Sequence, residues 1–138
     1  MIVQGQTTSF KKELYEAIHN FTTDTFKIAL YTANATLNQD TTAYTATGEI
    51  TGTGYTAGGK SLVNPIVSSA SGVAYISFDN ISWAPASFTV RGALIYNSSN
   101  SDASVAVLDF GSDKVSTSTF TITFPANTAT SAIIRSSN

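Results

Sequence analysis

The chain has 138 residues, of which 42% are hydrophobic and 12% are charged, and its formal net charge at pH 7 is −2. This composition fits one domain with its own core and excludes a disordered chain, which needs low hydrophobicity and high net charge. It also provides no basic field to attract nucleic acid, and the absence of cysteine excludes disulfides, thiolate metal sites and cysteine nucleophiles.

The first predicted elements are an N-terminal arm over residues 1–8 and an amphipathic helix over residues 9–20. Ser9 is the expected N-cap of this helix. Its apolar residues recur at spacings of four, four and three, which is the helical period: Phe10, Leu14, Ile18 and Phe21. His19, near the helix end, is expected at the surface.

Residues 24–138 have the pattern of a β body. Alternation is strictest over residues 119–124, where Phe and Ile face one side and Thr the other. Other strands are expected at residues 26–31, 73–78, 88–96, 105–110 and 131–135. The strand over 88–96 is apolar on both faces toward its end, as in a covered central strand. This pattern favours a mainly β fold, a β-sandwich or jelly-roll-like domain with one N-terminal helix.

Residues 34–62 are rich in Gly and Thr and show no sustained period. We expect an extended flap there, with short strands near residues 49–51 and 61–63. Long segments without regular structure in compact domains are usually functional or disordered.

A hairpin can be placed in register around residues 97–102, a turn cluster of Asn, Ser and Asp. If the turn centres near Asn100, Arg91 lies opposite Asp109 and Ala93 lies opposite Val107. The sequence therefore predicts a salt bridge between Arg91 and Asp109.

Residues with catalytic chemistry are few and scattered. His19 is the single histidine, and no Gly-x-Ser-x-Gly elbow supplies a nucleophile. No His or carboxylate cluster has metal-ligand spacing. We predict no catalytic residue, no metal and no cofactor. A small hydrolase using Glu49 or Asp79 is a distant alternative.

Residues 54–61 match the formal phosphate-binding string Gly-x-x-x-x-Gly-Lys-Ser. A phosphate site of this kind needs a helix directly after the loop. Residues 62–65 instead read as a strand broken by Pro65, so we interpret the match as accidental.

Several segments together resemble a family of small virion proteins of tailed bacteriophages. The resemblance covers nearly the whole chain, and it lies in residues 4–11 (QGQTTSFK), 26–32 (FKIALYT), 41–44 (TTAY), 52–59 (GTGYTAGG), 91–97 (RGALIYN) and 105–111 (VAVLDFG). It implies a capsid cement or decoration protein with a β-sandwich or jelly-roll body, commonly trimeric. It brings no catalytic motif.

The resemblance implies a virion location, assembled in the host cytoplasm, with the major capsid protein as partner. Nucleic acid and membranes are not expected as partners, because no basic field, signal peptide or apolar run of roughly 18–20 residues occurs. A small-molecule substrate is not expected either. The arm and the flap suit contacts with neighbouring subunits. The candidate contact residues are Ile2, Val3, Gln4, Gln6, Tyr44, Tyr55, Lys60 and Trp83.

The role of Trp83 has two possible interpretations. A lone Trp beside a Pro loop is more often a core edge or an interface anchor than a sugar-stacking platform. The sugar-stacking interpretation belongs to an alternative function. In that alternative the chain is a tail, baseplate or fibre-associated module with a glycan-binding face around Trp83 and the tyrosines.

Overall fold

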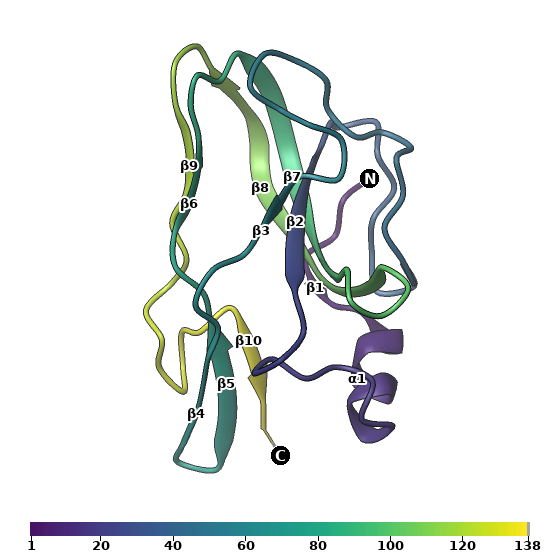
Figure 1. Cartoon of the computed structure of the whole chain (residues 1–138), viewed down its shortest axis with the longest axis vertical. Helices are drawn as coiled ribbons and strands as arrows, with labels where there is room; N and C mark the ends of the chain where they lie inside the picture. The colour runs from purple at the N-terminus through teal and green to yellow at the C-terminus, as the bar shows by residue number, and fades with distance from the viewer. Residues whose placement is uncertain (138) are drawn as a thin grey trace.

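The computed structural model describes residues 1–137 and is mainly β with one helix, as expected (Figure 1). Its elements in chain order are β1 (Gly5–Gln6), α1 (Thr8–Tyr15), β2 (Phe26–Tyr31), β3 (Lys60–Ser61), β4 (Ile66–Ala70), β5 (Val73–Ser77), β6 (Ile81–Trp83), β7 (Phe88–Asn97), β8 (Ala103–Ser116), β9 (Phe120–Ile122) and β10 (Ile134–Ser136).

The strands form three antiparallel sheets. The largest has five strands in the order β1-β8-β7-β2-β3, and the others have the orders β10-β5-β4 and β6-β9. In Figure 1 the β6–β9 pair lies beside the upper part of the large sheet, and the β4–β5 hairpin projects at the lower end.

The central strands β2 and β7 and the first half of β8 are buried on both faces of the five-stranded sheet. Ile28, Leu30 and Ile95 point into the larger core, which also takes in Trp83 of β6 and Ile134 of β10. The other face belongs to a second core and is covered by chain without regular structure; its members are Ile2, Ala29, Tyr31, Ala35, Leu37, Leu94, Tyr96 and Val107. The prediction that residues 88–96 end as a covered central strand is therefore confirmed.

The helix is shorter than predicted. The N-cap is Thr7 rather than Ser9, and its Oγ1 accepts a hydrogen bond from the Phe10 N–H at 3.3 Å. At the other end, Ala17 adopts a left-handed conformation with φ 58°. The N–H groups of Ala17 and Ile18 then bond to the carbonyls of Leu14 and Glu13, which is the Schellman arrangement. This early turn carries His19 under the helix.

The expected Arg91–Asp109 pair is wrong. The predicted register holds next to the turn, where Tyr96 lies opposite Ser104, but a bulge at that point shifts the ladder by one residue. Gly92 therefore lies opposite Asp109. A second irregularity follows, and the Arg91 Nε donates to Asp113 Oδ1 at 3.0 Å instead.

Other boundaries also differ from the expectations. The predicted strand over 105–110 extends to Ser116, whereas the one over 119–124 is reduced to β9, and β1, β4 and β6 were not predicted. Residues 49–51 contribute only an isolated bridge between Glu49 and Tyr31. The N-terminal arm over residues 1–8 contacts its own chain, as β1 against β8 and as a bridge from Ile2 to Leu37.

Gly59 and Gly72 provide a matched test of how closely the irregular segment packs on β2, because the two glycines have the same φ angle. Gly59 and Gly72 both have φ +79°, but a Cβ on Gly59 would lie 1.8 Å from the Ile28 carbonyl oxygen, whereas one on Gly72 would meet nothing within 4 Å. Gly72→Ala should lower the free energy of unfolding by about 1–2 kcal/mol from the left-handed conformation alone. Gly59→Ala should lower it by more than about 3 kcal/mol, because the backbone of β2 must also move. Urea denaturation measures both values, and equal losses would contradict the described contact.

Candidate functional site

Glu49 is the centre of a polar cluster on the irregular segment over residues 32–59. Its Oε1 accepts from the Tyr44 hydroxyl at 2.6 Å. Its Oε2 accepts from the Tyr55 hydroxyl and, at 2.8 Å, from the Gly58 N–H. The Glu49 carboxylate thus binds three donors that lie five, six and nine residues away from it along the chain.

Two further tyrosines extend the cluster to the sheet. The Tyr31 hydroxyl of β2 donates to the Thr45 carbonyl, and the Tyr96 hydroxyl of β7 donates to the Gly58 carbonyl, each at 2.6 Å. The ring of Tyr44 stacks on that of Tyr96 with centroids 5.0 Å apart. The cluster therefore fastens the irregular segment to the sheet that it covers.

Burial keeps these phenols neutral. It raises the pKa of Tyr96 to about 12. Burial, followed by the hydrogen bond to Glu49, raises the pKa of Tyr44 and Tyr55 well above the ordinary value. The pKa of Tyr31 is also raised, mainly by burial. Neutral phenols remain hydrogen-bond donors, which is what the cluster requires of them.

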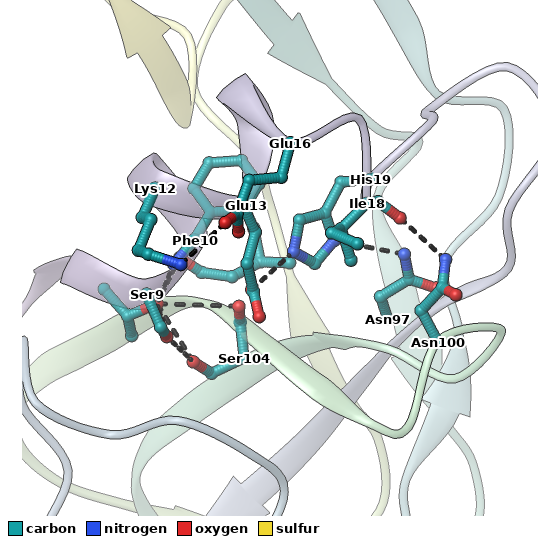
Figure 2. Close-up of polar contacts among 12 residues, drawn as sticks. Ser9, Phe10, Lys12, Glu13, Glu16, Ile18, His19, Asn97, Asn100 and Ser104 are labelled. Carbon is teal, nitrogen blue, oxygen red and sulfur yellow. Dashed lines mark hydrogen bonds and ion pairs between the residues drawn. The ribbon is translucent and has the colours of Figure 1, made fainter.

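His19 is the centre of a second polar cluster, at the foot of the helix (Figure 2). The expected surface position is wrong, because the residue is buried and its ring lies 5.0 Å from that of Phe10. Its Nε2 contacts Glu13 Oε1 at 2.9 Å and its Nδ1 contacts Asn97 Nδ2 at 3.1 Å. Asn97 Nδ2 also donates to Asp24 Oδ2 at 2.9 Å.

These contacts fix the tautomer of His19. Asn97 donates from Nδ2 to a carboxylate oxygen and accepts at Oδ1 from the Ser99 N–H, so the orientation of its amide is determined. Nδ1 of His19 must then accept, and Nε2 carries the proton that it donates to Glu13. Both ring nitrogens are occupied, so this imidazole holds the helix end to the β7–β8 turn and offers no lone pair to a substrate.

The N-terminal contact candidates lie mostly against their own chain. Ile2 is buried in the second core, Gln4 accepts at Oε1 from the Asp109 N–H at 3.0 Å, and Gln6 donates to a carbonyl of β10 at 2.7 Å. Val3 keeps an exposed apolar side chain. Tyr44 and Tyr55, as described, bind Glu49.

Trp83 and Lys60 also have partners within the chain. Trp83 is only 1% exposed and lies in the larger core, which excludes an indole platform open to sugars at this position. Lys60 donates from Nζ to the Ser82 carbonyl and lies over the Trp83 ring, 5.5 Å from its centroid. Lys60 belongs to strand β3, and no helix follows it within residues 61–137. The phosphate-loop string of residues 54–61 therefore lacks the helix N-terminus that a phosphate site of this kind needs.

Several large apolar side chains that were not among the predicted contact residues are exposed at the surface. They include Tyr15, Val63, Ile66, Val67 and Val115. A mostly apolar groove of about 370 Å³ lies between the end of α1 and the β10-β5-β4 sheet, with Leu14, Phe21, Val67 and Ile134 in its lining. The signal for the hairpin was the run Ile66-Val67 between Pro65 and the Ser71-Gly72 turn.

Comparison of the chain with protein-family models, curated proteins and solved structures finds no match. Within residues 1–137 there is no group of three or more His, Asp or Glu side chains placed to hold a metal ion. The same residues include no helix long and apolar enough to cross a membrane.

Glu49→Gln should destabilise the fold, because an amide nitrogen replaces one of the two acceptor oxygens that face three donors. We expect a loss of about 2–3 kcal/mol in the free energy of unfolding, together with faster amide exchange over residues 44–58. Glu16→Gln is the matched control, since Glu16 pairs with Lys12 at the surface and should change stability by less than about 1 kcal/mol. Equal effects of the two variants would refute the fastening role of Glu49.

Asp24 predicts a specific loss of stability in acid. The Asn97 side chain, followed by the Asn20 N–H, binds its carboxylate and holds the pKa of Asp24 below the ordinary value. A lowered carboxyl pKa stabilises the fold above the unfolded-state pKa of about 3.9, and this contribution disappears as the pH falls through the folded-state pKa. The stability advantage of the wild type over Asp24→Asn should therefore be constant above about pH 5 and shrink below about pH 4. Denaturation curves across this range test it, and an advantage that grows in acid would contradict it.

Proposed function

We propose that this chain is a non-enzymatic structural protein of a phage particle, a capsid cement protein that binds the major capsid protein at three-fold-type positions. It acts as a homotrimer, and its place is the virion, assembled in the host cytoplasm. The sequence resemblance to small virion proteins supports this class, and the exposed apolar side chains support the role.

The observation that carries the proposal is the exposure of large apolar side chains on a surface with little charge. Tyr15 is 94% exposed and Val115 is 72% exposed, while charged residues make up only 12% of the chain. Such a surface is poorly protected against association. It suits a protein that spends its life in contact with neighbours.

The ionisable side chains also support a structural role. Glu49, His19 and Asp24 are the ionisable groups that a reaction would recruit first, and each binds partners of its own chain. Their hydrogen bonds explain these three side chains as groups that hold loops in place. The function is therefore sought in contacts made by the exterior.

The alternative function is a tail, baseplate or fibre-associated module. The same exposed apolar surface would suit it, but its copy number and its position in the particle would differ from those of a cement protein. A glycan-binding face centred on Trp83 is not supported, because the indole ring is buried and cannot stack on a sugar. The remaining difference is where in the particle the protein sits.

Binding to purified capsid shells tests the proposal directly. The protein should bind as a trimer, saturate at a copy number equal to that of the local three-fold sites, and raise the temperature at which shells break. Electron microscopy of decorated shells should place it between major capsid subunits. A particle that carries only a few copies, all at the tail, would refute the cement role.

A further inference from the structure

Strand β4 ends its sheet with an open edge that carries no charge. Of the strands that end a sheet within residues 1–137, β4 is the longest, and its five residues read Ile-Val-Ser-Ser-Ala. Ile66 is 45% exposed and Val67 is 52% exposed. Proteins usually protect such edges with Lys, Pro or a bulge, because unpaired N–H and C=O groups recruit another strand.

The turn of the hairpin decides which groups face outward. Ala70 pairs with Val73 across the two-residue turn Ser71-Gly72, whose φ angles are 53° and 79°. A turn of this kind starts from a hydrogen-bonded pair, and bonded and non-bonded pairs then alternate along the ladder. Residues 66, 68 and 70 therefore bond to β5, and Val67 and Ser69 direct their N–H and C=O groups to the open edge.

We propose that the open edge of β4 pairs antiparallel with β4 of a second copy, around a two-fold axis at Ser68. In this register Val67 lies opposite Ser69 of the other copy, so both residues form hydrogen-bonded pairs. Four N–H···O bonds then join two copies into one continuous six-stranded sheet. No like charges meet, because the strand has none.

The neighbouring registers are worse for stated reasons. A two-fold axis at Val67 would place Ser69 opposite Pro65, which has no N–H to donate. An axis at Ser69 would place Val67 opposite Ser71, which lies in the turn. The sequence of the hairpin thus favours one self-pairing over its alternatives.

The pairing is weak in dilute solution. A strand of five residues is about 17 Å long, so two such edges bury much less than the roughly 800 Å² per partner of a standard interface. It gains strength where many copies are held close together, since a second contact between tethered partners is effectively intramolecular.

Single cysteines test the register, because the chain has no cysteine of its own. In the proposed pairing the two Ser68 residues form a non-hydrogen-bonded pair with Cα atoms about 4.5 Å apart, which a disulfide spans. Ser68→Cys should therefore form disulfide dimers at high protein concentration at a rate roughly tenfold above that of Ser69→Cys. Ser69 is the matched control, since it is the more exposed residue and would react faster by random collision.

Adding Val67→Lys to Ser68→Cys should reduce dimer formation to the control rate, because it places a charge on the open edge. Val67 is half-exposed, so this variant should fold, which circular dichroism checks. Equal rates for the two cysteine variants, or no effect of the lysine, would overturn the pairing. The assay uses the purified chain alone, so its outcome is independent of whether the protein binds capsid shells.

Discussion

The burial of the central strands β2 and β7 on both faces of the large sheet is the constraint on which the rest of the structure depends. One face packs against the smaller sheets, which supply regular cover. The other is covered by the irregular segment over residues 32–59 together with the N-terminal residues. A segment without strands of its own cannot satisfy its backbone groups in a ladder, so it needs side-chain partners. Glu49 and its tyrosines provide them.

This constraint also explains where the ionisable groups are. A partly buried carboxylate is tolerated when donors surround it, and Glu49 has three. The His19 cluster does the same for the helix end and the β7–β8 turn. Groups held in this way rigidify the body. A rigid body can then present its apolar exterior to partners without a large entropic cost of ordering.

The sequence predicts those parts of the fold in which periodicity and burial coincide. Strands β2 and β7 were located because their apolar residues alternate or run continuously. The bulge beside Val105 escaped prediction because Val105 and Ala106 are both apolar and both enter the larger core, so the pattern carries no sign of the extra residue. His19 was misplaced because the helix was expected to continue through Ala17, a residue that rarely adopts the left-handed conformation.

The uncharged edge of β4 connects the fold to the proposed role. For a protein that acts alone, such an edge invites aggregation, and one lysine would remove the hazard. A two-fold contact is closed, because both edges are used once two copies meet, so it does not propagate by itself. Combined with three-fold trimers it would instead link each trimer to its neighbours, and a contact too weak to form dimers in solution would become a bond in a shell-wide network.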